Sequence, residues 1–365
     1  MLPTPAAPNR IIGFDLARAY AILGMFIVNF NFCFGSFQNN TPIGQFLNLF
    51  TGNSTAIFII CAGLSLSLLT NRAAINSHEQ RQRIKSRILK RSWFLVVIGL
   101  LLYPWWPGDI LHFYGGYMHI AAYLLFVPRN YYLLGAGAAI IIFHVLLLII
   151  PINTSWDFAT FKYADFWTVQ GFLRNTLYNG WNSLFPWIAY FLLGMWLGRI
   201  NWQDGNTRRN VFLTGLVLFA LVEGIRKYAV YAHLNRQILN YIMYDYFPPY
   251  LPFMIITASF ALMIITACLW LGERFGAFGP VQWLAALGRM TLTNYVLHIT
   301  LGMLVLQALT GRKYTGLLQM QTPVSPEYIL LFSLACYGAC VAFSALWSHR
   351  FSHGPLEALM RKIAG

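Results

Sequence analysis

The chain has 365 residues, of which 58% are hydrophobic and only 10% charged, and its formal net charge at pH 7 is +14. A globular protein is roughly 45–50% apolar and about 25% charged, so this composition excludes an ordinary soluble domain. The positive charge does not indicate nucleic acid as a partner, because Lys and Arg accumulate in the cytoplasmic loops of membrane proteins. Backbone groups in lipid must be paired internally, so long apolar runs form helices. The sequence predicts an all-α polytopic membrane protein.

Ten apolar segments approach the ~20 residues that cross a bilayer. The predicted spans are about 11–34, 43–70, 88–105, 109–127, 131–151, 183–200, 210–230, 250–271, 284–310 and 327–348. No small-residue cleavage motif follows the first segment, so we expect a retained helix and not a signal peptide. Residues 1–365 are expected to form one integral membrane domain with a bundle of about ten transmembrane helices.

The distribution of Lys and Arg predicts the orientation. The segment 71–91 holds Arg72, Arg81, Arg83, Lys85, Arg87, Lys90 and Arg91. Placing it in the cytoplasm puts both termini inside, with sixteen Lys/Arg in inside segments and seven outside. This asymmetry predicts an N-in, C-in topology. The longest outside connection, 152–182, is rich in aromatic residues, which fits an interfacial belt or a lid over a substrate site.

Three groups of polar residues lie where lipid disfavours them, since an ionisable side chain within a span costs at least about 2.5–3.5 kcal/mol. In the first predicted span, Asp15 and Arg18 are three residues apart on one helical face and are expected to pair. That pair has either a structural role or a role in substrate binding. Asn29 lies fourteen residues beyond Asp15, near the same face and in the outer half of the membrane.

The second group opens the span at 109–127. Asp109 and His112 are three residues apart, and His119 follows seven residues later with Gly115 and Gly116 between the histidines. This stripe is polar, with a glycine notch that admits a helix or a ligand. A carboxylate beside a histidine fixes its tautomer and suits it to act as a general base. The alternative is that Asp109 caps the helix and the histidines bond backbone groups.

The third group lies in 287–302. Arg289, Thr293 and Asn294 recur at helical spacing, and His298 follows Asn294 by four residues. A helix with these side chains on neighbouring faces is expected to face the bundle interior. His144, alone in an apolar run, is more typical of a packed histidine.

The cysteines predict neither a disulfide framework nor a metal site. Cys33, Cys61, Cys268, Cys336 and Cys340 are scattered among apolar segments. Cys336 and Cys340 are four residues apart, but no histidine or further cysteine lies near them in the sequence, so packing is the expected role.

Five stretches together carry a family resemblance. They are "RIIGFDLARAYAILGMFIVNF" (10–30), "GDILHFYG" (108–115), "LFPWIAYFLLGMWLGR" (184–199), "LGRMTLTNYVLH" (287–298) and "HRFSHGPLEALMRK" (349–362). In this order and spacing the chain resembles the YeiB-like membrane proteins, within the superfamily that includes heparan-α-glucosaminide N-acetyltransferase. Ala19 replaces the glycine usual at that point of the first stretch.

The resemblance implies acyl transfer across a membrane. Cytoplasmic acyl-CoA, with acetyl as the expected group, is the donor. The acceptor is a hydroxyl or amine of a sugar or envelope glycan on the far side. It also implies a multi-pass protein of the bacterial cytoplasmic (inner) membrane, with the oligomeric state left open, a homodimer included. The basic segment 71–91 either attracts the CoA phosphates or only signals topology.

One departure affects the mechanism. In the heparan-type enzymes a histidine about eleven residues beyond the first-helix asparagine is the base, and here that position is Asn40. The substitute base is expected among His112, His119 and His298, with Asp109 orienting a histidine. Asn29 or Asn294 is expected to stabilise the oxyanion. The residues expected to contact substrate are Asn29, Asp15, Arg18, Arg289 and Asn294.

Buried Asp, Arg and His side chains also mark proton-coupled pathways, so a proton-coupled transporter or lipid flippase is the alternative function. A non-catalytic sensor or scaffold is a weaker third hypothesis, because it gives no reason for so many polar groups within the membrane.

Overall fold

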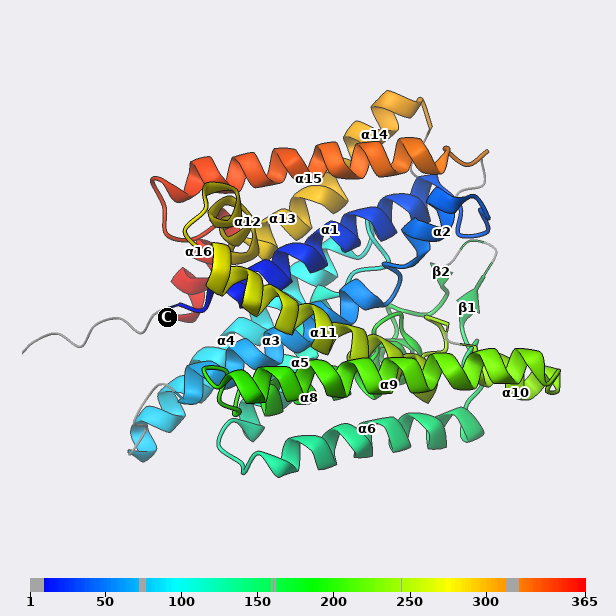
Figure 1. Ribbon diagram of the computed structural model, residues 1–365, viewed down its shortest axis with the longest axis horizontal. Helices are drawn as coiled ribbons and strands as arrows, with labels where there is room; N and C mark the ends of the chain where they lie inside the picture. The colour runs from blue at the N-terminus through cyan, green and yellow to red at the C-terminus, as the bar shows by residue number, and fades with distance from the viewer. Residues whose placement is uncertain (1–9, 72–76, 159, 161, 244, 313–321) are drawn as a thin grey trace, which may run out of the picture.

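The computed structural model describes residues 10–71, 77–158, 160, 162–243, 245–312 and 322–365, and it is helical almost throughout (Figure 1). The helices are α1 (Ile12–Phe34), α2 (Pro42–Asn48), α3 (Asn53–Asn71), α4 (His78–Leu102), α5 (Leu111–Leu124), α6 (Asn130–Ile149), α7 (Val169–Arg174), α8 (Leu184–Leu197), α9 (Gly205–Tyr231), α10 (Arg236–Ile242), α11 (Leu251–Phe275), α12 (Gly279–Arg289), α13 (Thr291–Leu297), α14 (Met303–Thr310), α15 (Pro326–Ser348) and α16 (Pro355–Ala364). Two π-helical turns, Asn175–Asn179 and His298–Gly302, and an antiparallel hairpin of β1 (Trp156–Asp157) and β2 (Lys162–Tyr163) complete the described fold.

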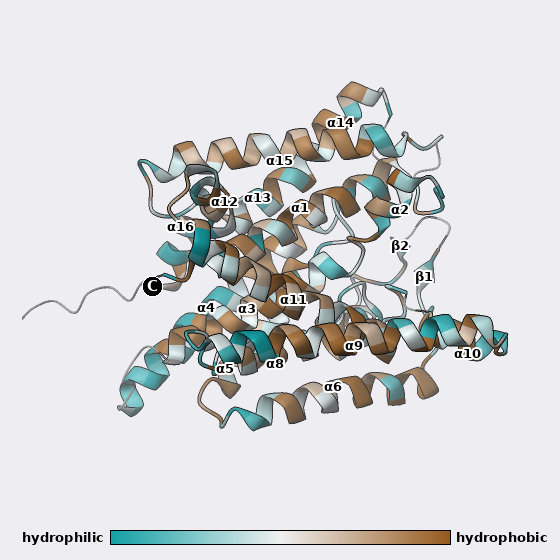
Figure 2. Ribbon diagram, viewed as in Figure 1, coloured by the Kyte–Doolittle hydropathy of each residue, from teal (hydrophilic) through white to brown (hydrophobic). Residues whose placement is uncertain are grey.

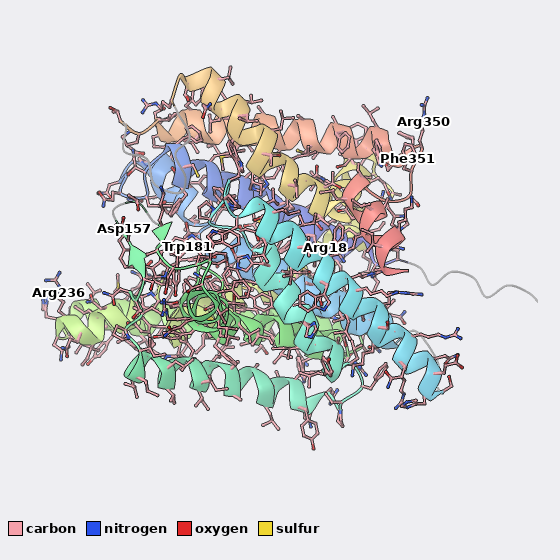
Figure 3. The ribbon with its side chains drawn as sticks, turned by 180° about the vertical axis from the view of Figure 1, so that it is seen from behind. Arg18, Asp157, Trp181, Arg236, Arg350 and Phe351 are labelled. Atoms are coloured by element: carbon pink, nitrogen blue, oxygen red, sulfur yellow. The ribbon has the colours of Figure 1, made fainter. Side chains whose placement is uncertain are left out.

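The long helices lie roughly side by side, so the bundle has two ends (Figure 1). The first described residues and α16 lie at one end, which we call the terminal end. The β hairpin, α2 and α10 lie at the other, which we call the hairpin end. Figure 3 shows Arg350 and Phe351 at the terminal end, and Asp157 and Arg236 at the hairpin end.

Helices occupy all ten segments predicted from the sequence, and the protein is a nearly all-α, multi-pass membrane protein. Six segments of the described residues are long and apolar enough to cross a bilayer: Ile12–Phe34, Pro42–Thr70, Asn130–Ile149, Leu251–Phe275, Thr291–Thr310 and Pro326–Ser348. Leu184–Leu197 is a shorter apolar helix. The count of ten spans and the N-in, C-in topology therefore remain predictions.

Two segments expected to be continuous spans are broken. The segment 43–70 is divided into α2 and α3 near Gly52, whose φ of +77° favours glycine and whose Cα faces the ring of Phe253. The segment 284–310 is broken at Met290 (φ −115°, ψ 38°) and again by the π-helical turn that begins at His298. Both breaks create local geometry that the periodicity of the sequence does not reveal.

The basic segment 71–91 is largely helical, since α4 begins at His78. Residues 72–76, including Arg72, lie outside the described residues, as does Lys313. Figure 2 shows hydrophilic residues on the first turns of α4, where the helix extends beyond its neighbours at the terminal end, and apolar residues along most of α6 and α15. This distribution suits a bundle whose sides face lipid.

Close helix packing places α1 and α3 at the centre of the bundle. Gly63 of α3 faces the carbonyl of Phe191 in α8, and Gly194 of α8 faces the carbonyl of Ile60 in α3. Small residues allow such backbones to approach in a membrane bundle. Helix α1 contacts α3, α11, α12 and α15, so polar groups on α1 can meet residues from several other helices.

Candidate functional site: two cavities that meet at Tyr295

A cavity of about 520 Å³ opens within the hairpin end of the bundle. Its wall combines aromatic rings with amide, hydroxyl and carboxylate groups. The aromatic members include Phe32, Phe37, Trp106, Phe158, Trp181, Tyr246, Phe247 and Tyr295, and the polar members include Asn29, Asn48, Thr51, Thr55, Asn182 and Asp245. Figure 3 shows Trp181 close to the β hairpin. Rings with a few directional polar groups are typical of a site for a small polar ligand with apolar faces.

A second cavity, of about 320 Å³, lies toward the terminal end. Three arginines from three different helices line it: Arg18 of α1, Arg91 of α4 and Arg289 of α12. Glu357 and Met360 of α16 also line it, so the C-terminal helix closes part of this cavity. We call the two spaces the hairpin-end cavity and the terminal-end cavity.

Two of the three arginines of the terminal-end cavity, Arg91 and Arg289, have no ion-pair partner among the described residues. Arg18 pairs with Asp15, but Arg289 makes no hydrogen bond or ion pair in the described part of the chain. The buried Nε of Arg91 has no partner among the described residues. Unpaired guanidinium groups around a cavity favour an anionic ligand, and phosphate matches their donor geometry.

Further positive charge lies just outside this cavity. Burial lowers the pKa of Arg361, and the neighbouring Arg10 and Arg87 lower it further. Burial also lowers the pKa of His353, helped by the positive charges of Arg361 and Arg10. These groups lie close enough to repel one another, so the terminal end carries an excess of positive charge that would concentrate anions.

The predicted pairing of Asp15 with Arg18 is confirmed. Arg10 also pairs with the buried Asp15, through Nε at 2.6 Å, so one carboxylate holds two arginines. Arg18 donates further to Ser65 Oγ (2.9 Å) and to the carbonyl of Gly288 (3.3 Å). Gly288 packs directly on the backbone of Asp15, which brings α12 and its Arg289 against α1.

The break at Met290 is stabilised from α16. Glu357 accepts hydrogen bonds from the backbone N–H groups of Leu292 (2.8 Å) and Thr293 (3.2 Å) and from the Thr293 hydroxyl (2.6 Å). These groups begin α13 and have no partner in their own helix, so the carboxylate caps them. The sequence element that contains Glu357 thus fixes the short helix that carries Tyr295.

His298 and Asn29 meet beside the hairpin-end cavity. Asn29 lines that cavity, and its Nδ2 lies 2.9 Å from Nε2 of the fully buried His298. An amide nitrogen donates only, so Nε2 is the acceptor and Nδ1–H donates to the carbonyl of Asn294 (3.3 Å). The imidazole is therefore neutral, with its lone pair directed at Asn29. Its ring stacks on Phe26 with centroids 4.5 Å apart.

Asp109 and His112 pair as the sequence predicts, with Oδ2 3.1 Å from Nδ1, and both are buried. The same oxygen accepts from the backbone N–H of His112 (3.1 Å), so Asp109 also caps α5. Its other oxygen accepts from the Tyr295 hydroxyl (3.2 Å). Nε2 of His112 has no partner among the described residues. Pairing and capping, stated as alternatives for the sequence, occur together.

The structure does not bring His119 or Asn294 to either cavity. His119 lies 3.2 Å from Ser92 Oγ at the contact of α5 with α4. A Cβ on Gly115 would lie 2.6 Å from the Ser92 carbonyl, so that half of the predicted notch receives α4. Asn294 Nδ2 donates to Met290 O (2.9 Å) and Ser344 Oγ (3.0 Å) and faces α15.

Sequence reasoning missed three residues of the cavities: Tyr295, Arg91 and Glu357. Tyr295 and Glu357 lie within the family stretches 287–298 and 349–362, so the resemblance was the sequence feature that could have indicated them. In the sequence, Arg91 is distinguished only as part of the basic segment 71–91. His144 is partly buried, with Nδ1 2.8 Å from the Ile140 carbonyl and Nε2 3.2 Å from the Tyr241 hydroxyl. Among the described residues, no three His, Cys, Asp or Glu side chains are arranged to hold a metal ion.

Two known families match the chain over two overlapping regions. Residues 10–232 match the catalytic domain of heparan-alpha-glucosaminide N-acetyltransferase. The chain belongs to this acetyltransferase family. Residues 197–365 match a second family, described as a protein of unknown function (DUF418), which agrees with the YeiB-like resemblance. No curated protein matches the chain.

The chain is thus a member of a family of transmembrane acetyltransferases, and its site draws on both matched regions. The acetyltransferase match contributes Asn29 and Asp109, whereas Tyr295, His298 and Glu357 come from the second match. Asn40, to which the resemblance assigns the position of the heparan-type histidine, is exposed and lines neither cavity. His298, which directly follows the last residue of α13, instead brings an imidazole to the first-helix asparagine, Asn29.

Proposed function

We propose that the protein is a transmembrane acyltransferase that moves an acyl group, acetyl in the first instance, from cytoplasmic acyl-CoA to a hydroxyl or amine. The acceptor is a sugar or envelope glycan on the far side of a bacterial cytoplasmic membrane. The terminal end faces the cytoplasm in this proposal. The observation that carries it is the meeting of an arginine-lined cavity and an amide- and ring-lined cavity at Tyr295.

The terminal-end cavity is the proposed donor site. Arg91 and Arg289 are available to phosphate oxygens of CoA, and the positive charge around Arg361 concentrates the anionic donor at this end. Arg18 and Asn29 are eleven residues apart on α1, about 16 Å at 1.5 Å per residue. An extended pantetheine arm is the part of the donor suited to cover that distance between the two cavities.

The hairpin-end cavity is the proposed acceptor site, and His298 is the proposed base. As the acceptor oxygen or nitrogen attacks the thioester carbonyl, its proton passes to Nε2 of His298. The Asn29 amide, which donates to Nε2 in the structure, then turns to donate to the developing oxyanion. The C–S bond breaks, and the departing CoA thiolate takes the proton from the imidazolium.

The test is acyl transfer by purified protein in sealed proteoliposomes. Radiolabelled acetyl-CoA is supplied on one side, and amino sugars, neutral sugars and simple amines are supplied on the other. We expect label to appear on an acceptor with release of free CoA, and His298→Ala to abolish it. Uptake of acceptor without acylation would favour the proton-coupled transporter. The proposal would be contradicted if no acceptor were either acylated or taken up.

A further inference from the structure

One side chain belongs to the walls of both cavities. Tyr295 lines both, and among the described residues no other side chain does. At the start of α5 the boundary between the cavities falls between two consecutive residues: Ile110 lines the hairpin-end cavity, and Leu111 lines the terminal-end cavity. On α3 the same boundary falls between Thr55 and Phe58, one turn apart. The two cavities therefore adjoin at Tyr295.

The ring is held across this boundary by its hydroxyl. The Tyr295 hydroxyl donates to Asp109 Oδ1 (3.2 Å) and accepts from the backbone N–H of Ile110 (3.2 Å). Asp109 is fully buried and is fixed in turn by the side chain and backbone of His112. A buried carboxylate with these partners is a stable anchor, because releasing any of them strands a polar group in an apolar interior.

The segment that carries the ring is short. Helix α13 (Thr291–Leu297) lies between the non-helical Met290 and the π-helical turn at His298. Such interruptions in a helix are frequent at functional sites, since they let a short piece shift without unwinding a long helix. Trp105 Nε1 donates to the carbonyl of Ile299 (2.6 Å), so the loop that supplies Asp109 is also bonded to that π-helical turn.

We propose that Tyr295 is a partition that keeps water of the acceptor side from the thioester until an acceptor occupies the hairpin-end cavity. This role rests on the proposed function. Water is a competing nucleophile for any thioester exposed to it, and sites that handle reactive acyl groups exclude it. An acceptor beside Trp106 and Tyr295 competes for the tyrosine's hydrogen bonds and displaces the ring. The partition thereby makes acyl transfer conditional on acceptor binding. Tyr295 is a positioning residue in this scheme, and Asp109 and His112 serve to anchor it.

Thioester hydrolysis without acceptor is the first readout. Removing the ring should raise the rate of CoA release from acetyl-CoA by about tenfold, which corresponds to about 1.4 kcal/mol of lost barrier. Tyr295→Ala and Tyr295→Leu should both show this rise, and the leucine variant fills more of the buried space if the alanine variant folds poorly. Tyr295→Phe, which keeps the ring without its hydroxyl, should lie between wild type and Tyr295→Leu. Tyr190→Ala is the matched control, because Tyr190 is a buried tyrosine that is bonded to Thr257 and lines neither cavity.

Thiol labelling gives a second readout that needs no activity. Ser65 lines the terminal-end cavity, so Ser65→Cys reports access to it. Right-side-out and inverted vesicles are treated with a small impermeant methanethiosulfonate, and labelling is compared with that of the chain without the added cysteine. We expect Ser65→Cys to be labelled from one face only, and from both faces when it is combined with Tyr295→Leu.

The outcomes separate this inference from the proposed function. If Ser65→Cys is labelled from one face, and from both faces once Tyr295→Leu is added, the partition is supported even when no acyl transfer is found. The proposed transferase function would then be rejected while the partition is kept. Normal transfer together with two-sided labelling of Ser65→Cys in the chain that keeps Tyr295 would reject the partition. Unchanged hydrolysis and unchanged labelling in folded Tyr295→Leu would also reject it.

Discussion

The hairpin-end and terminal-end cavities share one side chain, yet their walls differ in kind. The first is lined by rings and amides, and its only ionisable acid is Asp245 in the described wall. The second is lined by three arginines, of which Arg91 and Arg289 lack ion-pair partners among the described residues. Unpaired charge within a membrane is retained where a ligand neutralises it. The contrast therefore assigns a phosphate-bearing ligand to one end and a neutral or weakly charged polar ligand to the other in our proposal.

The largest effect is expected from His298, the proposed base beside the acceptor in the hairpin-end cavity. His298→Ala should lower the transfer rate by about 10²–10⁴, the usual cost of losing a general base, while CoA binding stays intact. Steady-state transfer and CoA binding by calorimetry measure the two effects. His119→Ala is the control and should turn over at nearly the wild-type rate, since His119 lies against α4. Near-normal transfer by folded His298→Ala would move the search for the base to His112.

At the terminal end the buried Asp15 forms ion pairs with both Arg10 and Arg18. Asp15→Asn leaves Arg18 without its buried partner and should destabilise the fold by about 3–5 kcal/mol. Asp15→Asn combined with Arg18→Gln should recover part of that loss, because no buried charge is stranded. Thermal unfolding in detergent and folded yield provide the measurement. Equal stability of the single and double variants would show that the pairing matters little.

Arg289 tests whether the unpaired charge of the terminal-end cavity serves the donor. Arg289→Ala should raise the KM for acyl-CoA by roughly 10- to 100-fold, since a hydrogen bond to a charged group contributes about 1.5–3 kcal/mol. The KM for the acceptor should not change. Arg350→Ala is the matched control, because Arg350 is exposed at the same end and lines neither cavity. An equal shift of the donor KM in Arg289→Ala and Arg350→Ala would contradict the assignment of the terminal-end cavity to the donor.

Trp181 tests whether the ring-lined wall of the hairpin-end cavity binds the acceptor and not the donor. Trp181→Ala should raise the KM for the acceptor by about 2- to 10-fold, in line with the 0.5–1.5 kcal/mol typical of an aromatic contact. Donor binding should be unaffected. Trp270→Ala serves as the control, because Trp270 is a partly exposed tryptophan of α11 that lines neither cavity. A change in the donor KM instead would contradict the assignment of this cavity to the acceptor.

The smallest effect is expected at the hairpin end, where Arg174 holds the 152–182 segment through Asp165 (2.6 Å). Hydrogen bonding from Arg174 lowers the pKa of Asp165. The stabilisation is present above the unfolded pKa of about 3.9 and is lost as pH falls through the lower folded value. The protection factors of the amides in β1, β2 and α7, which are corrected for the intrinsic pH dependence of exchange, should stay constant from neutral to mildly acidic pH and fall in strong acid. Asp165→Asn should remove this acid step, and an unchanged step would assign it to another group.

The sequence alone determined the class of protein, the helical segments and the local pairs. Apolar run length decides that helices form, because the bilayer leaves no other partner for backbone groups. Helical spacing brought Asp15 to Arg18 and Asp109 to His112, since residues three apart share a face whatever the rest of the chain does. The order of the five family stretches likewise anticipated the family.

Only the tertiary structure decided which of these residues share a site. His298 reaches Asn29 from a distance of 269 residues along the chain, and Tyr295 reaches Asp109 across 186. The helix break at Met290, the cap from Glu357 and the π-helical turn at His298 set these contacts, and none of them follows a helical period. The same packing turned His119 toward α4 and Asn294 toward α15, because a polar residue at the right spacing still faces whichever neighbour the bundle supplies.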